Sequence, residues 1–408
     1  MSKKLHVYLN SEHVGELEQN KHGQMTFRYI PEWLNSSLAF PISCSLPMRE
    51  ETFTEKECRP FFAGILPEDT ARKLIAKNLG ISANNDFSML EKIGGECAGA
   101  ITFLDESEKL NKTINQYEAL NDQTLVELLQ KLTYQPLLAG QKNVRLSMAG
   151  VQDKLPVHVK NGKFSIPLGS SPSTHILKPI NIHFSGLHYN EAFCMTLASA
   201  CGFLTADAEI KSISGIEFLL IERYDRYLND GKIVRLHQED FCQATAIVPE
   251  RKYQSEGGPS FKNCFALLRH SSVVPVVDLE RLIEAVIFNV LVGNCDAHGK
   301  NFSLVYGQHG ITLAPLYDLV CTTYYKSLTT KMAMKVGKEY DVNKIKLGHF
   351  EVLAEQIGFS KAAIRNYVNA TTEKVLSVLA EVPITNQIEA DIAEIIKYRC
   401  ERFKANIL

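Results

Sequence analysis

The stretch GNCDAHGKNFSL, residues 293–304, places an Asp, a His, a Lys and an Asn within six positions. It follows LIEAVIFNVLV, residues 282–292, an apolar run with the period of a buried helix. A polar loop that leaves such a helix is held firmly by the core behind it. Asp296 and Asn301 are five positions apart, as are the base and the metal-binding amide of the protein-kinase catalytic loop. The stretch therefore predicts the catalytic loop of a kinase-like fold.

The chemistry of phosphoryl transfer requires these residue types. A carboxylate receives the proton of the attacking hydroxyl, and nearby oxygen ligands hold Mg²⁺ against the phosphates. We expect Asp296 to be the catalytic base and Asn301 to be a metal ligand. Asp318, seventeen positions further on in LAPLYDLV, is the second expected metal ligand. His298 is expected to brace the catalytic loop, and Lys300 is expected to help bind the nucleotide.

Further features stand upstream in the order that kinases use. SMAGVQDK, residues 147–154, is a loop of small residues whose backbone N–H groups suit phosphate oxygens. Lys178 lies at the end of the apolar strand THILKPI, as the phosphate-binding Lys of kinases does. Glu191, at the start of the next predicted helix, is placed to pair with Lys178. The backbone of residues 222–224, in EFLLIERYDR, is expected to form the hinge that binds adenine.

Length and composition describe the chain more coarsely. Its 408 residues are 45% hydrophobic and 22% charged, with a formal net charge of −2, so the chain has no overall basic footprint for nucleic acid. No apolar run is long enough to span a membrane and the N-terminus lacks a signal-peptide pattern, so we expect a cytoplasmic protein without a membrane partner. The ten scattered cysteines are expected to be reduced, mostly buried thiols and not zinc ligands.

The hydrophobic pattern predicts an α+β chain in four segments. These are an N-terminal α/β subdomain (1–105), a linker with a helix (106–144), a β-rich nucleotide-binding lobe (145–240) and an all-helical catalytic lobe (241–408). Asn161-Gly162 between two alternating runs predicts a β-hairpin with a type I′ turn. Pro67 and Gly80 are expected to begin and end a helix. Asp278 is the expected N-cap of the helix that precedes the catalytic loop.

Taken together, the motifs resemble a known family. SMAGVQDKL, STHILKP, the pair NE at 190–191, LIERYDR, HQEDFCQA, GNCDAHGKNFSL and LAPLYDL are similar to those of HipA-type toxins, which are bacterial Ser/Thr protein kinases. FFAGILPEDTARKLIA and GGECAGAITFL resemble the N-terminal subdomain of that family. The resemblance spans nearly the whole chain. It implies a two-lobed, protein-kinase-like fold of the phosphoinositide-kinase-like branch, with an extra N-terminal subdomain.

The resemblance also implies roles for individual residues. Asp296 would be the base, and Asn301 and Asp318 would hold Mg²⁺. The residues implied to bind ATP are Ala149, Gly150, Val151, Gln152, Lys154, Lys178, Glu191, Glu222, Arg223, Tyr224 and Lys300. Ser147 matches the autophosphorylated Ser of the family, whose modification expels the phosphate loop and inactivates the kinase. Asp153 is unusual for a phosphate-binding loop, because its negatively charged side chain would repel the ATP phosphates.

The family also implies partners. Its substrates are aminoacyl-tRNA synthetases, typically the glutamyl enzyme, and their phosphorylation arrests translation and favours dormancy. Its antitoxin is a small helix-turn-helix protein of the HipB type, through which the toxin reaches operator DNA. Two alternatives remain open: a small-molecule or lipid kinase on the same lobes, and a kinase-shaped protein that acts mainly as an antitoxin-binding co-repressor.

Overall fold

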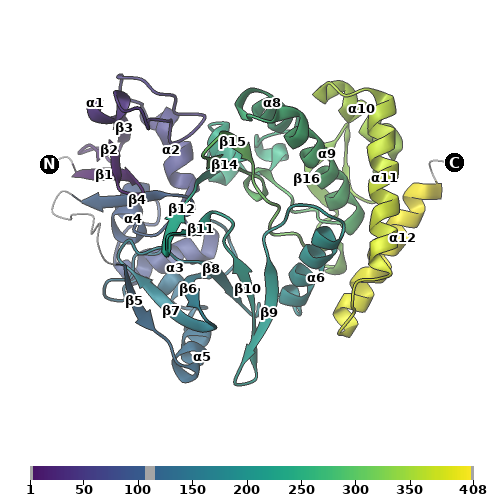
Figure 1. The fold of residues 1–408 in the computed structure, drawn as a ribbon, viewed down its shortest axis with the longest axis horizontal. Coiled ribbons are helices and arrows are strands. Elements are labelled where there is room, and N and C mark those ends of the chain that lie inside the picture. Colours follow the sequence, from purple (N-terminus) through teal and green to yellow (C-terminus); the bar gives the residue numbers. More distant parts are fainter. Residues whose placement is uncertain (1–2, 106–114, 406–408) are drawn as a thin grey trace. The chain divides into compact units, whose positions relative to one another are not determined.

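A computed structural model describes residues 3–105 and 115–405. The chain forms two compact units, drawn in Figure 1. Unit 1 comprises Met1–Pro179 and Lys211–Pro249, and unit 2 comprises Ile180–Ile210 and Glu250–Leu408. The first part of the expected linker, residues 106–114, lies outside the described residues. None of the helices in the described ranges is both long and apolar enough to cross a membrane.

The N-terminal part of unit 1 is an antiparallel sheet covered by helices. The strand order is β3-β2-β1-β4, with β1 at Lys3–Leu9, β2 at Glu12–Gln19, β3 at Met25–Tyr29 and β4 at Ile101–Asp105. Strand β1 forms because its apolar residues alternate and face the core. The helices are α1 (Pro31–Leu34), α2 (Glu55–Gly64), α3 (Asp69–Leu79) and α4 (Asp86–Ile93). Helix α3 ends at Gly80 as predicted, but it begins after Glu68, so the predicted start at Pro67 is wrong.

A six-stranded sheet forms the second part of unit 1, in the order β5-β7-β6-β8-β10-β9. Its strands are β5 (Gln116–Ala119), β6 (Leu155–Lys160), β7 (Lys163–Leu168), β8 (His175–Pro179), β9 (Ala208–Ile213) and β10 (Ile216–Glu222). Asn161 and Gly162 have φ +51° and +72°, so the predicted turn between β6 and β7 is confirmed. Helix α5 (Asp122–Lys131), strands β11 (Arg226–Asn229), β12 (Lys232–Arg235) and β13 (His237–Asp240), and helix α7 (Phe241–Ala244) complete this part.

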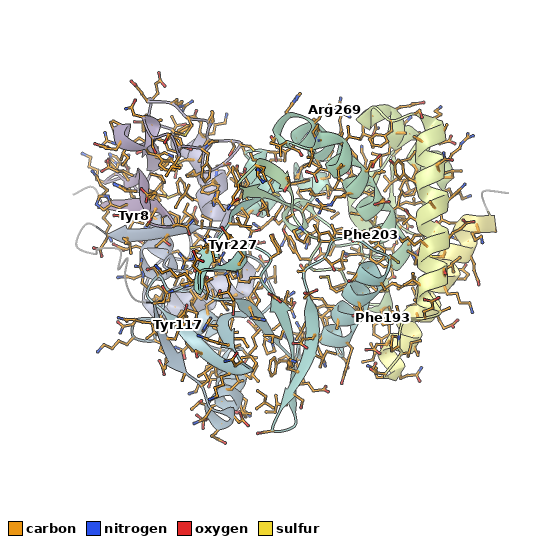
Figure 2. The ribbon with its side chains drawn as sticks, in the orientation of Figure 1. Tyr8, Tyr117, Phe193, Phe203, Tyr227 and Arg269 are labelled. Carbon is orange, nitrogen blue, oxygen red and sulfur yellow. The ribbon has the colours of Figure 1, made fainter. Side chains whose placement is uncertain are left out.

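Unit 2 is built on the buried helix α9 (Pro275–Val292), which packs against α8 (Phe261–Ser271), α11 (Lys361–Leu379) and α12 (Gln387–Ala405). Helices α6 (Leu187–Ala200) and α10 (Leu347–Ile357) complete the bundle. Phe203 and Phe193 are labelled in this unit in Figure 2, and the ring of Phe203 meets that of Phe288 edge-on at 5.2 Å between centroids. Nine of the ten cysteines of the chain are buried.

Two sequence-based expectations for unit 2 are wrong. The C-terminal segment is not all-helical, because it contains β14 (Ser303–Gly307) paired with β15 (Gly310–Leu313), and β16 (Lys331–Val336) paired with β17 (Glu339–Asp341). Asp278 does not cap α9, because Pro275 occupies the first turn and Val274 is the N-cap. Asp278 is fully buried, and its Oδ2 accepts a hydrogen bond from the N–H of Leu313 at 2.7 Å. It therefore ties the helix to β15.

Candidate active site

The predicted catalytic loop begins where α9 ends, at Gly293. This glycine has φ +75°, and a Cβ added to it would lie 2.3 Å from Oγ1 of Thr323, so a larger residue does not fit without displacement. The side chain of Asn294 then fixes the loop. Its Nδ2 donates to Oδ1 of Asn289 at 2.8 Å, and its Oδ1 accepts from the N–H of Asp296 at 3.2 Å. The buried helix therefore anchors the loop.

Asp296 has an exposed side chain at the tip of this loop. Its Oδ1 accepts a hydrogen bond of 2.7 Å from Oη of Tyr253. Its other oxygen, Oδ2, accepts no hydrogen bond from residues 3–105 or 115–405. The carboxylate is thus held on one side and open on the other, which is the arrangement that a base for an incoming hydroxyl requires.

Asn301 and Asp318 are brought together, as the sequence predicts for two ligands of one metal. Nδ2 of Asn301 donates to Oδ2 of Asp318 at 2.8 Å, and Oδ1 of Asn301 accepts from the N–H of His298 at 3.1 Å. Amide and carboxylate oxygens are the ligands that Mg²⁺ prefers, and phosphate oxygens and water usually complete its shell. The described residues contain no cluster of three or more His, Cys, Asp or Glu side chains that could hold a metal alone. The pair therefore fits Mg²⁺ bound together with a phosphate.

The remaining loop residues are packed into unit 2. His298 is buried, and its ring meets the ring of Tyr253 edge-on at 5.4 Å between centroids. Lys300 is also buried, and its carbonyl oxygen accepts from Oη of Tyr317 at 2.7 Å. Tyr317 directly precedes Asp318, so it connects the backbone of the short helix η4 (Gly299–Asn301) to the second expected metal ligand.

Glu191 lies fully buried in the first turns of α6. Its neighbour Asn190 docks this helix onto the segment that follows Asp318. Nδ2 of Asn190 donates to the carbonyl of Cys321 at 3.0 Å, and its Oδ1 accepts from the N–H of Cys321 at 2.8 Å. A side chain that pairs with both backbone groups of one residue fixes that residue tightly. The helix with Glu191 and the segment with Asp318 therefore form one rigid part of unit 2.

The other predicted residues belong to unit 1, where β8 carries Lys178. This lysine is buried and lies opposite Leu219 in the pairing of β8 with β10. Glu222 ends β10 with an exposed side chain. Arg223 follows, and both of its backbone groups are engaged: its N–H donates to the carbonyl of Thr174 at 3.0 Å and its carbonyl accepts from the N–H of Arg226 at 3.2 Å. The predicted hinge is thus joined to the start of β8. Tyr224 follows, and a hydrogen bond from its Oη to Oε1 of Gln238 fixes its ring.

The predicted phosphate loop is folded around its own lysine. Nζ of Lys154 donates to the carbonyl of Ala149 at 2.8 Å. Gly150 has φ +107°, a backbone conformation that other residues rarely adopt, so the turn needs a glycine here. Val151 and Gln152 lie at the outer part of the loop, with the side chain of Val151 about half exposed.

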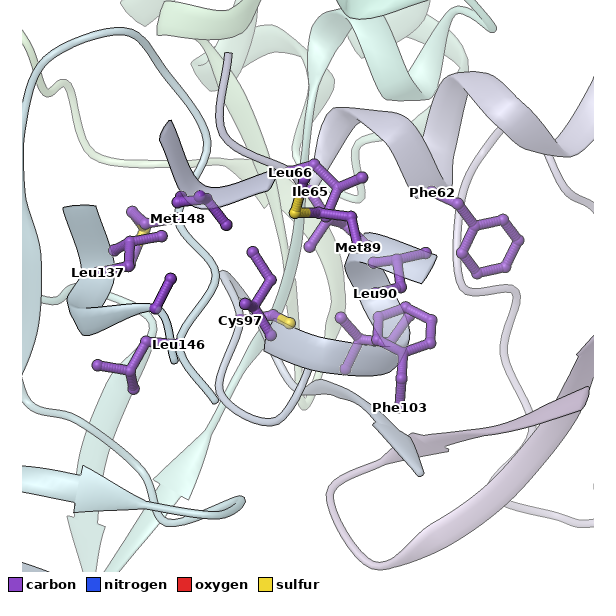
Figure 3. Packing of buried hydrophobic residues seen from close by; sticks show 14 of the residues in the cluster. Phe62, Ile65, Leu66, Met89, Leu90, Cys97, Phe103, Leu137, Leu146 and Met148 are labelled. Carbon is purple, nitrogen blue, oxygen red and sulfur yellow. The ribbon is translucent and has the colours of Figure 1, made fainter. Parts of the chain in front are cut away.

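Ser147 is fully buried just before this loop. Its Oγ donates to the carbonyl of Ile65 at 3.0 Å, and its N–H donates to the carbonyl of Glu96 at 2.8 Å. Leu146 and Met148, on either side of it, belong to the hydrophobic core of unit 1 shown in Figure 3. The predicted modification site is therefore locked into the core in this conformation.

A buried ion network joins Glu96 to the predicted hinge. Oε1 of Glu96 lies 3.1 Å from a guanidinium nitrogen of Arg223 and 3.0 Å from one of Arg226, and Oε2 contacts Arg235. Asp225 pairs with Arg223 at 2.7 Å and with Arg226 at 3.0 Å. Three guanidinium groups thus face two carboxylates inside unit 1.

The electrostatics of this network keep both acids ionised. Burial raises the pKa of Glu96, but the guanidinium groups of Arg235, Arg226 and Arg223 outweigh burial and hold that pKa below its ordinary value. Burial likewise raises the pKa of Asp225, and the neighbouring arginines lower it well below its usual range. The side chain of Arg223 is therefore committed to this network, next to the backbone of the predicted hinge.

The structure brings the predicted residues together in two groups. Unit 2 holds Asp296, His298, Lys300, Asn301, Asp318 and Glu191, and unit 1 holds Ser147, residues 149–154, Lys178 and residues 222–224. Sequence reasoning missed Tyr253 and Glu96. Their only signals were the polar motif RKYQSEGGP and the Glu within GGECAGAITFL, and neither shows which residue it contacts.

Comparison with known proteins identifies the family. The model described as HipA N-terminal domain matches residues 5–104, and the model described as HipA-like C-terminal domain matches residues 146–379. The chain therefore belongs to the HipA family of toxin kinases. It is 43% identical over 400 residues to Y4mE of Sinorhizobium fredii, a protein named as a kinase, with 96% of this chain and 94% of that protein covered.

A toxin and its structure are among the relatives. The chain is 28% identical to the serine/threonine-protein kinase toxin HipA of Shewanella oneidensis, over 98% of this chain and 95% of that protein. A solved structure of the Shewanella oneidensis toxin–antitoxin system, with HipA, HipB and operator DNA, matches with a TM-score of 0.87 at 27% identity. The match covers 99% of this chain and 98% of the HipA chain.

Proposed function

We propose that this protein is an ATP- and Mg²⁺-dependent Ser/Thr protein kinase that acts as a HipA-type toxin on a two-lobed, kinase-like fold of the phosphoinositide-kinase-like branch. The observation that carries the proposal is the geometry of unit 2. Asp296 presents one open carboxylate oxygen, and Asn301 and Asp318 touch at 2.8 Å in the same chain segment. A base and a pair of oxygen ligands for Mg²⁺ are what phosphoryl transfer to a hydroxyl needs.

Each residue has a definite task in this mechanism. Asp296 orients the acceptor hydroxyl and receives its proton as the new O–P bond forms, while the bond from the γ-phosphorus to the bridging oxygen breaks and ADP leaves. Asn301 and Asp318 hold Mg²⁺, which supplies positive charge against the phosphates when it is bound. Lys178 binds ATP phosphates, and Glu191 is its proposed partner. Lys300 helps to bind the nucleotide.

The proposed adenine and phosphate contacts come from backbone groups of unit 1. Glu222 and Tyr224 contact adenine at the hinge, and Arg223 supports them through its ion network. Residues 149–154, including Lys154, contact the phosphates. The bond of Lys154 to the carbonyl of Ala149 supports this role, because a lysine already held in the loop needs little rearrangement to meet a phosphate.

Autophosphorylation at Ser147 is the proposed form of self-inhibition. The hydroxyl is buried and already bonded to the Ile65 carbonyl, so it must leave the core before it can accept a phosphate. A phosphoserine carries a charge of about −2, which the apolar surroundings of Leu146 and Met148 cannot accommodate. Modification would therefore keep the neighbouring loop, residues 149–154, out of its place.

The biological partners are proposed from the resemblance to the HipA family. We propose an aminoacyl-tRNA synthetase as the substrate, with the glutamyl enzyme as the first candidate, so that phosphorylation arrests translation. We propose a HipB-type helix-turn-helix antitoxin as the binding partner, with operator DNA contacted through it. The solved complex of the Shewanella oneidensis proteins supports this assignment. With such partners, the proposed location of the protein is the bacterial cytoplasm.

The test compares the wild-type protein with Asp296→Asn. Transfer of labelled phosphate from Mg-ATP to the synthetase is expected to fall by about 10²- to 10⁴-fold in the variant, the usual contribution of a general base. ATP binding is expected to persist, because the base does not hold the nucleotide. Mass spectrometry of the same incubations is expected to find phosphate on Ser147 in the wild-type protein and none in the variant.

The control variant is Asp391→Asn, which changes an exposed Asp of α12 that only accepts a bond from Gln387. It is expected to match the wild-type rate. Undiminished transfer by Asp296→Asn would show that another group is the base. Transfer to a small molecule or lipid, with no labelled protein, would instead identify a different kind of kinase.

A further inference from the structure

Tyr253 makes the one hydrogen bond that the side chain of Asp296 receives from the described residues. The phenol oxygen lies 2.7 Å from Oδ1 and donates its proton to it. Hydrogen bonds to an ionised carboxylate are stronger than those between neutral groups. Because Asp296 is exposed, its side chain would rotate freely without this contact. The hydroxyl of Tyr253 therefore fixes the rotamer of the proposed base.

The segment around Tyr253 is itself rigid. The carbonyl of Tyr253 accepts bonds from the N–H groups of Glu256 at 3.0 Å and Gly258 at 2.9 Å. A Cβ added to Gly258 would lie 2.4 Å from the carbonyl oxygen of Arg251, so only glycine lets the chain turn back this closely. These contacts fix the backbone of Tyr253, and the fixed backbone directs its side chain toward the catalytic loop.

Strand β16 connects this segment to the catalytic loop. The N–H of Lys335 donates to Oε1 of Gln254 at 3.0 Å, next to Tyr253. Two residues earlier in the strand, the N–H of Ala333 donates to the carbonyl of Cys295 at 2.8 Å, next to Asp296. One strand thus holds both partners of the tyrosine–aspartate bond, so their separation is set by the fold of unit 2.

The ring of His298 also contacts Tyr253. Its ring meets the ring of Tyr253 edge-on, at 5.4 Å between centroids and an interplanar angle of 78°. This is a favourable aromatic arrangement. The bracing role expected for His298 thus reaches Asp296 through the tyrosine ring.

The two oxygens of Asp296 show whether Tyr253 can position the base without blocking the acceptor hydroxyl. If the phenol occupied the only usable oxygen, it would block an acceptor hydroxyl. Oδ2 accepts no hydrogen bond from residues 3–105 or 115–405, so an oxygen remains for the acceptor while Tyr253 holds Oδ1. A carboxylate accepts several hydrogen bonds, and both contacts are compatible with one orientation.

We propose that Tyr253 is a positioning residue for the phosphoryl-transfer reaction: its hydroxyl holds Oδ1 of Asp296 so that Oδ2 faces the acceptor hydroxyl. The proposal rests on the assignment of Asp296 as the base in the function proposed above. Tyr253 needs no contact with ATP or with the acceptor. Its contribution is to keep the base in the one orientation that accepts the proton, which lowers the barrier of the chemical step.

Tyr253→Phe tests the proposal, because it removes the hydroxyl and keeps the ring against His298. We expect kcat for phosphate transfer to the synthetase to fall about tenfold, the loss expected for one hydrogen bond to a charged group at an exposed site. KM for ATP and the thermal midpoint are expected to stay at wild-type values. Tyr398→Phe is the matched control, since Tyr398 is 66% exposed on α12, and it is expected to leave kcat unchanged.

A double variant separates positioning from a general structural role. If Tyr253 acts through Asp296, adding Tyr253→Phe to Asp296→Asn should reduce the residual rate by much less than tenfold. An additional tenfold loss in the double variant would overturn the proposal, as would a wild-type kcat in Tyr253→Phe. A faster Tyr253→Phe would also overturn it and would show that the phenol competes with the acceptor. If Asp296→Asn itself transfers phosphate at the wild-type rate, the base assignment fails instead.

Discussion

At the scale of single residues, His237 is a buried histidine that stays neutral. Its Nε2 donates to the carbonyl of Ile42 at 2.7 Å, and the rings of Phe40 and Phe61 lie about it at 6.3 and 6.2 Å between centroids. Burial lowers its pKa from 6.5 to about 4, and the Ile42 carbonyl and the Asp225 carboxylate offset only part of that shift. The folded protein therefore resists protonation at this position.

This shift predicts a loss of stability in mild acid. In the unfolded chain His237 binds a proton near pH 6.5, whereas the folded chain binds it only near pH 4, so the unfolded state holds more protons in between. Above pH 6.5, His237 makes its full contribution to the free energy of unfolding. As the pH drops from 6.5 toward 4 that contribution is lost, so the free energy of unfolding falls by about 2 kcal/mol between pH 7 and pH 5. Urea unfolding followed by the fluorescence of Trp33, the only Trp of the chain, reports on unit 1 and measures the loss.

His237→Gln should make the unfolding free energy less dependent on pH, at the cost of a lower value at pH 7. His22→Gln, which changes an exposed histidine, should leave the pH dependence as it is in the wild type. An unchanged difference between pH 7 and pH 5 in His237→Gln would show that other groups carry the acid sensitivity.

At the scale of elements, Asp278 shows how a long-range contact replaces a local one. It precedes LERL, so the sequence favours a helix N-cap, but the helix begins at Pro275, one turn earlier. Inside the first turn its carboxylate accepts from Oγ of Ser272 at 2.7 Å, the N–H of Leu313 at 2.7 Å and the guanidinium of Arg281 at 2.9 Å. The residue therefore joins three elements of unit 2.

We expect Asp278→Ala to destabilise unit 2 by about 3 kcal/mol, because it leaves a buried N–H without its acceptor and a guanidinium without its carboxylate. Hydrogen exchange of the amides of α9 and β15, read by mass spectrometry, is the measurement that locates the loss. Asp391→Ala, at an exposed position, should change exchange only near itself. Equal protection of β15 in Asp278→Ala and the wild type would contradict the role of this carboxylate.

Local chemistry explains which elements the sequence predicts. The Asn161-Gly162 turn and the helix end at Gly80 are determined by the residues at those positions, so they can be predicted without knowing the rest of the fold. The hairpin of β14 and β15 was missed because its strands have only five and four residues, too few for a clear alternation beside the long helical pattern of α9. The candidate active site shows the same difference between local features and contacts that are distant in the sequence. The interval from Asp296 to Asn301 is local, whereas Tyr253 meets Asp296 across 43 positions that no periodicity records.

At the scale of the whole molecule, Glu96 connects the two parts of unit 1. Its backbone pairs with the Ser147 segment, and its carboxylate binds Arg223 and Arg226, at sequence separations of 127 and 130, and Arg235 further along the chain. Glu96 belongs to the matched N-terminal domain, residues 5–104, and its partners belong to the matched C-terminal domain, residues 146–379. Glu96 is thus one of several buried side chains that join the residues matched by the two family models, as Ser43 does with Glu239 and His237 does with Ile42, and the sequence alone does not single it out.

Glu96→Gln tests this bridge, because it keeps the volume of the side chain and removes its charge. Arg223 and Arg226 would then share Asp225, and Arg235 would lose its carboxylate partner, so the buried net charge would rise from +1 to +2. Breaking a buried ion pair from one side costs about 3–5 kcal/mol, so we expect the urea midpoint reported by Trp33 to fall sharply. KM for ATP should rise as well, because Arg223 loses a partner next to the proposed hinge.

The comparison with Glu91→Gln isolates the effect of burial. Glu91 pairs with Lys3 at 3.1 Å, but the side chain of Lys3 is 55% exposed, so the pair is screened by water and its loss should cost less than about 1 kcal/mol. If both variants unfold at the same urea concentration, the buried network contributes no more than a surface pair. If only Glu96→Gln is weakened but its KM for ATP stays at the wild-type value, the network stabilises unit 1 without shaping the hinge. A change in both quantities would mean that the N-terminal domain helps to build the nucleotide site, since its Glu96 is the residue through which stability and ATP affinity would then be coupled.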